Sequence, residues 1–389
     1  MREKLDEHLR ARPMELKKMQ KDGVKVIGVA PGGYMPEELV HACGAVSTSV
    51  GLVRGGEPEP ILHSGAYIPR WIDTFCRAQI GYKELNEDPL YEIIDLLVVP
   101  ITDQNIRAMA DCFDFYTDIP VFRYGVPHVK KDYALRYYTD GLYLLKEKLE
   151  EVTSSKIDYS KLHSSIEVFN RERELLNEIS SLRKEANPPI SGKEFIRLNH
   201  ASFLAEKTFM VEMLERILDE LREKSPGTTK GPRILLTGST IAIGDYKILD
   251  ILETCGAQVV IEEFTEGMRH YSELVEPGDD IFDALADRYF QRRIGGAYFR
   301  PGKERLEYII KLAKEFRVDG VVWYTLMYRD SWDFEEYYFS DILKKETGLP
   351  MLTLRSDYDS SEIALIRTRI ETFIETIKRG VNDSKGGKI

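Results

Sequence analysis

Thiols are scarce in this chain. Its 389 residues include four cysteines, and no two of them have the C-x-x-C spacing of zinc-binding modules. A disulfide framework is not expected in a large acidic chain, because such frameworks stabilise small secreted domains. Scattered cysteines most often pack as small apolar side chains, although three or four could still meet around a metal or a cluster. The four positions are Cys43, Cys76, Cys112 and Cys255.

Long apolar runs and an excess of positive charge are also missing. No apolar run approaches the roughly 18–20 residues that cross a bilayer. With 54 Lys and Arg against 65 Asp and Glu, the net charge of −11 argues against a nucleic-acid surface, which needs clustered cations. The first residues, MREKLDEHLRARPMELKK, are charged and predict a helix rather than the apolar core of a signal peptide. We therefore expect a cytoplasmic protein that binds neither nucleic acid nor membrane.

The segment GSTIAIGD at 238–245 lacks the spacing of both the G-x-G-x-x-G fingerprint and the Walker loop, so a nucleotide is not indicated. Its small residues and free N–H groups before a helix do resemble an anion cradle. Ser239 and Thr240 are therefore candidates for substrate binding. An ordinary glycine turn is an equally good interpretation.

Strand-like apolar runs alternate with helical patterns in two separate parts of the chain, 1–151 and 231–389. This alternation predicts an α/β protein with two doubly wound parallel-sheet domains of the Rossmann or flavodoxin-like kind. The predicted strands lie at 24–30, 45–53, 94–100, 119–123, 233–238, 257–264, 318–324 and 349–354.

The segment 152–230 between these parts is predicted to be a helical insertion. Apolar residues from Leu162 to Leu182 recur at spacings of three, four and seven, which marks one face of a long helix. SPGTTKGP at 225–232 is the clearest linker. The last predicted helix, 361–378, precedes a small, charged tail from Arg379 that is expected to be disordered.

The loops after the predicted strands hold the candidate chemistry, because open α/β sheets bind ligands outside the carboxyl ends of their strands. TLMYRDSW follows the strand VDGVVWY and offers Arg329 for catalysis and Tyr328 and Asp330 for substrate binding. ITDQN follows another strand, and its Asp103 is expected to cap the next helix. Glu263, at the end of AQVVIEEF, could act as a general base, although two exposed surface carboxylates are the commoner interpretation of this Glu-Glu pair.

Several segments, taken in order, resemble the family of 2-hydroxyacyl-CoA dehydratase and ATP-dependent benzoyl-CoA reductase subunits. The resemblance covers nearly the whole chain. It rests on MPEELVHACGA (35–45), IDTFCRAQIG (72–81), IIDLLVVPITDQNIRAMAD (93–111), PRILLTGSTIAIGDYKILDILETCGAQVVIEE (232–263), VDGVVWY (318–324) and GLPMLTLRSDYDSSEIALIRTRIETFIE (348–375).

This resemblance implies a subunit of two α/β domains with added helices that pairs with a second, homologous subunit. It also implies a [4Fe-4S] cluster in the cleft between the domains, an acyl-CoA substrate, and a separate ATP-hydrolysing iron–sulfur activator that supplies single electrons. One electron added to the thioester carbonyl gives a ketyl radical anion, which expels the α-hydroxyl and acidifies the β position. Three thiolates leave one iron of the cluster free to bind the carbonyl oxygen.

The chain departs from the family pattern at the cluster positions. Cys76 matches the first of the three usual cysteines. Where the family has Cys-Asp at the other two, this chain has Thr102-Asp103 and Arg329-Asp330. Threonine and arginine are poor iron ligands, so the usual cluster is not expected in this chain alone.

Three interpretations follow. The chain is a subunit of a dehydratase or benzoyl-CoA reductase complex whose partner holds the active cluster, and Arg329 then pairs with a carboxylate or a CoA phosphate. Alternatively, it holds a cluster through an unusual set of Cys76 and other cysteines. In the third, it is a non-catalytic relative that binds an acyl-CoA or an anion.

Overall fold

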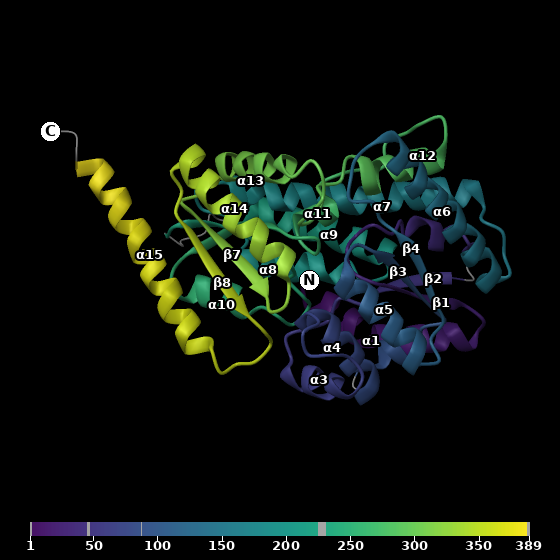
Figure 1. Cartoon of the computed structure of the whole chain (residues 1–389). Helices are drawn as coiled ribbons and strands as arrows, with labels where there is room; N and C mark the ends of the chain where they lie inside the picture. The colour runs from purple at the N-terminus through teal and green to yellow at the C-terminus, as the bar shows by residue number, and fades with distance from the viewer. Residues whose placement is uncertain (1, 45–46, 87, 225–230, 387–389) are drawn as a thin grey trace.

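The computed structural model describes residues 2–44, 47–86, 88–224 and 231–386 of the chain, with side chains as far as residue 380. The chain forms two four-stranded sheets, one from its N-terminal part and one from its C-terminal part, with helices packed around both (Figure 1). Every strand pair in both sheets is parallel. The predicted α/β fold with two parallel sheets is therefore confirmed. Most of the linker predicted at 225–232 lies outside the described residues.

The first sheet has the strand order β2-β1-β3-β4. Its strands follow the predicted apolar runs, and β1 and β3 are buried along most of their length because helices cover both faces. The strands are β1 (Lys25–Val29), β2 (Ser47–Gly51), β3 (Leu96–Ile101) and β4 (Val121–Gly125). The helices of this part are α1 (Arg2–Lys21), α2 (Glu38–His41), α3 (Pro58–His63), α4 (Thr74–Leu85), α5 (Gln104–Tyr116) and α6 (Asp132–Thr153).

The second sheet repeats this arrangement with the order β6-β5-β7-β8. All seven residues of β7, its second central strand, are buried. The strands are β5 (Arg233–Gly238), β6 (Gln258–Glu263), β7 (Gly320–Leu326) and β8 (Met351–Ser356). The accompanying helices are α10 (Lys247–Thr254), α11 (Met268–Tyr271), α12 (Ile281–Ala286), α13 (Lys303–Glu315), α14 (Asp330–Thr347) and α15 (Ile363–Gly386), with a π-helical turn η5 (Asp287–Gln291) after α12.

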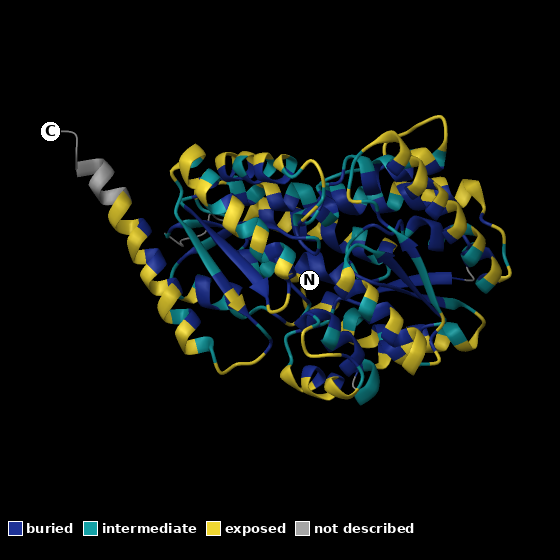
Figure 2. Cartoon of the chain, in the orientation of Figure 1, coloured by how far each residue is buried: buried dark blue, intermediate teal, exposed yellow. Residues whose placement is uncertain are grey.

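Three helices connect the two sheets: α7 (Tyr159–Ser181), α8 (Gly192–Ala201) and α9 (Lys207–Glu223). Asp158 caps the start of α7, and a capping box formed by Ser191 and Glu194 starts α8. The predicted apolar face of α7 is buried against α9, with Leu176 and Ile179 fully covered. Figure 2 shows that the strands of both sheets are mostly buried, whereas the outer faces of the helices are exposed.

Some helix boundaries differ from the predictions for local reasons. The amphipathic pattern of YIPRWIDTFCRAQIG at 67–81 predicts one helix. The helix begins only at Thr74, because the side chain of Asp73 accepts the Cys76 N–H and so caps it there. At the other end, α15 continues to Gly386, so that the tail predicted to be disordered from Arg379 is helical as far as that residue. Among the described residues, none of the helices is both long and apolar enough to cross a membrane.

Each sheet has one switch point, where successive connections leave a central strand in opposite directions, and the two switch points face each other. In the first sheet the chain moves from β1 to β2 on one side and then to β3 on the other side of β1, and β5, β6 and β7 repeat this pattern. Such switch points are where open α/β sheets bind ligands. Backbone bonds between Val53 and Ile243 and between Gly55 and Ile243 join the segment after β2 to the loop after β5. The carboxyl ends of the two sheets therefore meet.

Candidate functional site

A pocket of about 60 Å³ lies where the two switch points face each other. Its walls include Gly32 after β1, Thr102 and Asp103 after β3, Ser239 after β5 and Arg329 after β7. All these residues follow the carboxyl ends of strands, as the sequence predicted for candidate binding residues. The pocket is therefore the candidate functional site.

A largely buried ion pair lies at the wall of this pocket. Nη1 of Arg329 donates to Oδ2 of Asp103 at 2.8 Å, and its Nε lies 3.6 Å from Oδ2 of Asp73. Burial by itself would lower the pKa of Arg329, but the charges of Asp73 and Asp103 outweigh it and raise that pKa. The guanidinium is therefore a fixed positive charge between two carboxylates, and it ties the first half of the chain to the second.

Asp103 has two roles at once. Its Oδ1 accepts the N–H groups of Asn105 and Ile106, so it is the N-cap of α5, which confirms the sequence prediction. Its other oxygen holds Arg329. Burial raises the pKa of the Asp103 carboxyl, but the Arg329 charge and the two N–H groups outweigh burial and leave the pKa below its usual value.

The Arg329–Asp103 contact predicts a pH-dependent stability. Because the folded-state pKa of Asp103 is depressed, the contact stabilises the fold above the unfolded-state pKa of about 3.9, and this gain is lost as the pH falls through the lower folded-state pKa. We expect Asp103→Asn, which keeps the cap, to lower the free energy of unfolding at pH 7 by about 1–2 kcal/mol. Denaturant unfolding of both proteins at pH 7 and near pH 3 measures this. An equal difference at both pH values would contradict the assignment.

Cys76 lies beside this ion pair but is fully buried. It sits in the first turn of α4, where its N–H donates to Oδ1 of Asp73 at 3.1 Å. Burial raises the pKa of its thiol well above the usual value, Asp73 and Asp103 add to the rise, and Arg329 opposes it. The structure thus brings Cys76, Asp103 and Arg329 into one charged cluster, next to Thr102, whose Oγ1 donates to Asp103.

These residues do not fit a [4Fe-4S] cluster. Such a cluster takes thiolate ligands, and the set here is one thiol, a threonine hydroxyl, two carboxylates and a guanidinium, which has only donor groups. Within the ranges that the structure describes, no group of three or more His, Cys, Asp and Glu side chains is arranged to hold a metal ion. The other cysteines have separate surroundings, since Cys43 bonds Leu39, Cys112 bonds Tyr67 and Cys255 contacts Glu371.

Ser239 and Thr240 line the pocket, as their place after β5 predicted. The preceding Gly238 has a φ of 142°, and a Cβ atom there would lie 1.7 Å from the carbonyl oxygen of Tyr324, so only glycine fits. The Ser239 Oγ accepts the N–H of Leu326 and thereby links the ends of β5 and β7. The hydroxyl of Ser239 is thus partly used to hold the loop.

Tyr328 and Asp330 are exposed and do not line the pocket. Tyr328 has a φ of 68°, and its carbonyl accepts a bond from Asn105 Nδ2 at 3.4 Å. This left-handed turn directs Arg329 inward, while Asp330 begins α14 on the surface. Of the three residues predicted from TLMYRDSW, only Arg329 faces the pocket.

Glu263 lies away from the pocket in a buried ion-pair network. Its Oε1 is 3.0 Å from Nε of Arg269, and its Oε2 accepts from Arg305 and Thr237, both at 2.7 Å. Glu262 is also fully buried, so the alternative of two exposed surface carboxylates is wrong. Burial raises the pKa of Glu263, but the two guanidinium groups outweigh it and lower that pKa. Both oxygens are engaged, which leaves neither free to take a proton in the pocket.

Glu266 and Arg269 are two charged pocket residues that were not predicted individually from the sequence. They come from the loop after β6, and both are almost completely buried. Oε2 of Glu266 and Nη2 of Arg269 have no hydrogen-bond partner. Burial raises the pKa of Glu266. Their loop, EEFTEGMR, stands after a predicted strand, and this position was the signal that could have singled them out.

Two parallel-sheet halves that meet across a charged pocket define an α/β protein with its candidate site between the halves. The chain belongs to the 2-hydroxyglutaryl-CoA dehydratase, D-component family, whose model matches residues 33–377. It is thus a subunit of the 2-hydroxyacyl-CoA dehydratase type, and the resemblance found in the sequence is confirmed.

Three characterised relatives support this assignment. The (R)-phenyllactyl-CoA dehydratase beta subunit of Clostridium sporogenes is 26% identical over 93% of this chain and 94% of its own length. A benzoyl-CoA reductase subunit of Thauera aromatica is 23% identical, with 91% of each chain covered. The lactoyl-CoA dehydratase subunit beta of Anaerotignum propionicum is 21% identical over 91% of this chain and 92% of its own length. All three are named as subunits, which implies a partner subunit for this chain.

Proposed function

We propose that this chain is the supporting subunit of a heteromeric 2-hydroxyacyl-CoA dehydratase. It binds part of the acyl-CoA substrate, and a second, homologous subunit with all three cysteines holds the [4Fe-4S] cluster. The observation that carries this proposal is the ion pair of Arg329 with Asp103 and Asp73 next to Cys76. In this chain a guanidinium lies where the family resemblance implies a thiolate.

The pocket residues suit an anionic or carbonyl-bearing part of a ligand. Arg269 brings an unpartnered Nη2, and Thr240 brings a hydroxyl to the pocket wall. Arg329 adds positive charge that Asp73 and Asp103 hold in place. Buried guanidinium groups pair well with carboxylate and phosphate oxygens. The role of these side chains is to bind and orient the thioester or a CoA phosphate, while the partner subunit takes up electrons from an ATP-dependent iron–sulfur activator.

A benzoyl-CoA reductase-type complex is the second candidate. It is favoured by the match to the Thauera aromatica reductase subunit over 91% of both chains. The two candidates share the fold, the pocket and the need for a partner, and they differ in the acyl-CoA that the complex transforms.

Anaerobic co-expression with a homologous subunit that has all three cysteines tests the proposal. We expect a stable complex that dehydrates 2-hydroxyacyl-CoA esters when activator, ATP and a reductant are added. Omission of this chain is expected to lower kcat by roughly 100-fold or more, because the substrate loses its positioning. Arg107→Gln, on the exposed face of α5, is the control variant and should leave the rate unchanged.

Three results would contradict the proposal. The first is full activity of the partner without this chain, and the second is turnover by this chain alone. The third is acyl-CoA binding without turnover in any combination, which would favour a non-catalytic relative. Reduction of an aromatic acyl-CoA in place of dehydration would support the second candidate.

A further inference from the structure

A second cavity, of about 40 Å³, lies behind the pocket at the carboxyl ends of β1 and β2. It shares Pro31, Gly32, Thr265 and Glu266 with the pocket, and these residues therefore separate the two spaces. Its other walls include residues of α7, α11 and η5. This volume has room for a few non-hydrogen atoms, because a cavity needs roughly 10–15 Å³ to hold one water molecule.

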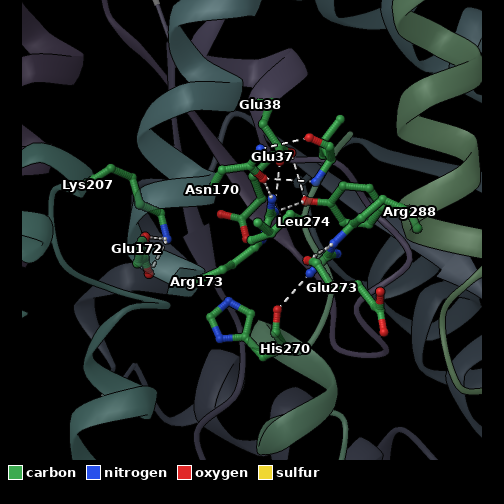
Figure 3. A network of polar contacts seen from close by, with 12 residues as sticks. Glu37, Glu38, Asn170, Glu172, Arg173, Lys207, His270, Glu273, Leu274 and Arg288 are labelled. Carbon is green, nitrogen blue, oxygen red and sulfur yellow. Dashed lines mark hydrogen bonds and ion pairs between the residues drawn. The ribbon is translucent and has the colours of Figure 1, made fainter. Parts of the chain in front are cut away.

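Three arginines line this cavity, and all are nearly inaccessible to solvent. Arg173, Arg288 and Arg293 are 3%, 2% and 3% exposed. Arg173 comes from α7 and Arg288 from η5, and Figure 3 shows that they converge near His270 of α11. Three guanidinium groups from different elements thus surround one small enclosed volume.

Among the described residues, Arg173 is the only one of these three arginines with an ion-pair partner. Arg173 donates to Oε1 of Glu38 at 2.8 Å, and the neighbouring Lys207 is paired with Glu172 at 3.1 Å. Among the described residues, neither Arg288 nor Arg293 forms an ion pair with a carboxylate. The cavity therefore has two buried positive charges without a counter-ion in contact.

The hydrogen bonds of these two arginines go to backbone carbonyls. Arg288 donates through Nε to Glu273 at 3.1 Å and through Nη2 to His270 at 2.7 Å. Arg293 donates to the carbonyls of Arg269 and Gly32 at 2.7 and 3.1 Å, and its Nε has no partner. Carbonyl dipoles orient a guanidinium but do not neutralise it, and an uncompensated buried charge costs several kcal/mol.

His270 and Glu37 also line the cavity, and among the described residues Glu37 forms no ion pair with Arg288 or Arg293. His270 is uncharged, because burial, with the charges of Lys207 and the three arginines, lowers its pKa well below the usual value. Burial and the charges of Arg173 and Arg293 lower the pKa of Arg288 to about 9. Glu37 accepts from the Ser49 hydroxyl at 2.6 Å.

Glu266 is the other carboxyl group of the cavity wall. Burial raises its pKa, although the charges of Arg269 and Arg329 oppose the rise, and its Oε2 has no hydrogen-bond partner. Among the described residues, Glu266 forms no ion pair with Arg288 or Arg293. It therefore supplies neither arginine with a counter-ion in contact.

We propose that this second cavity binds a small oxyanion, either inorganic phosphate or the carboxylate of a small organic acid, held by Arg288 and Arg293 with Arg173 beside them. Charge-assisted hydrogen bonds from guanidinium groups to such oxygens are short and strong, and they offset the cost of the buried charges. The site is separate from the Arg329 pocket and does not depend on the function proposed for that pocket.

Calorimetric titration of the full chain tests the proposal with two probes, inorganic phosphate and acetate, each against chloride at equal ionic strength. We expect one saturable site per chain for at least one probe, with a matching rise in Tm. Arg288→Gln and Arg293→Gln should each weaken that binding at least tenfold. Arg171→Gln is the matched control, because Arg171 lies on the exposed side of α7 and pairs with Glu215. It should bind as the unmodified chain does.

The titration of the unmodified chain shows whether the chain binds an oxyanion even if a variant does not fold. No saturable binding of either probe beyond the chloride control would overturn the proposal. Binding that persists unchanged in both folded cavity variants would overturn it as well, because the anion would then sit elsewhere. If neither glutamine variant folds, Arg288→Lys replaces them, and unaltered affinity in that variant counts against the site.

Discussion

Replacing Thr102 and Arg329 together by cysteine is expected to turn this chain into one that takes up about four irons on anaerobic reconstitution, the content of one [4Fe-4S] cluster. The unmodified chain should retain far less than one iron under the same treatment. The double variant supplies the two thiols that the family resemblance implies and this chain lacks. Cys76 supplies the third.

The geometry supports this result. The Arg329 guanidinium contacts Asp103, the residue after Thr102, and lies 3.6 Å from Asp73, which caps the helix turn of Cys76. Removal of the guanidinium frees the space between these positions and also removes a cation that would repel iron. Iron and sulfide analysis, with the visible absorption of the cluster, measures the outcome.

The controls isolate the role of the three positions. Thr102→Cys alone and Arg329→Cys alone offer two thiols each and should bind much less iron. Adding Cys76→Ser to the double variant should abolish the gain. If the double variant folds but remains free of iron, the three positions do not form a cluster site. Arg329 would then not stand at the position of a family cysteine ligand.

Glu263→Gln is expected to destabilise the fold by about 3–5 kcal/mol, the cost of breaking a buried ion pair. The substitution keeps the shape of the side chain but removes the negative charge between Arg269 and Arg305. Arg305 retains Glu335, whereas Arg269 has no other ion-pair partner among the described residues. Denaturant unfolding at pH 7 measures the loss of free energy.

A matched control removes a carboxylate from an exposed pair. Glu178 contacts Arg222 at 2.7 Å, and both side chains are largely solvent-accessible. Glu178→Gln should therefore cost less than about 1 kcal/mol. A general base at Glu263 would give the opposite pattern, with little change in stability and a fall in kcat of roughly 100-fold or more in the folded complex.

The strands and the pocket loops were predictable because their signals are local. The run RILLTG became β5 with the predicted bounds, and Asp103 caps α5 because the short side chain stands directly before the helical pattern. The rule that ligands bind after parallel strands was enough to point to Arg329, Ser239 and Thr240, which line the pocket, and their roles in binding and catalysis stay a prediction. These inferences needed only neighbouring residues and the alternation of elements.

The partners of buried charges were not predictable, because they come together only in the folded chain. Glu263 meets Arg305, which lies 42 residues further along, and Arg173 meets Tyr289, which lies 116 residues away. Nothing in either local pattern marks such pairs. The orientation of the loop residues Tyr328, Arg329 and Asp330 was not predictable either. The sequence predicted the loop, but it did not show that Arg329 faces the pocket while Tyr328 and Asp330 are exposed.

The iron and sulfide content of the unmodified chain, expressed without a partner and purified under argon, decides whether this chain holds a cluster by itself. We expect well below one iron per chain and no cluster absorption, because a guanidinium held by Asp103 and Asp73 lies where the family resemblance implies a thiolate. About four irons per chain, lost on Cys76→Ser, would show that the chain binds a cluster without a partner and would overturn the supporting role proposed for it.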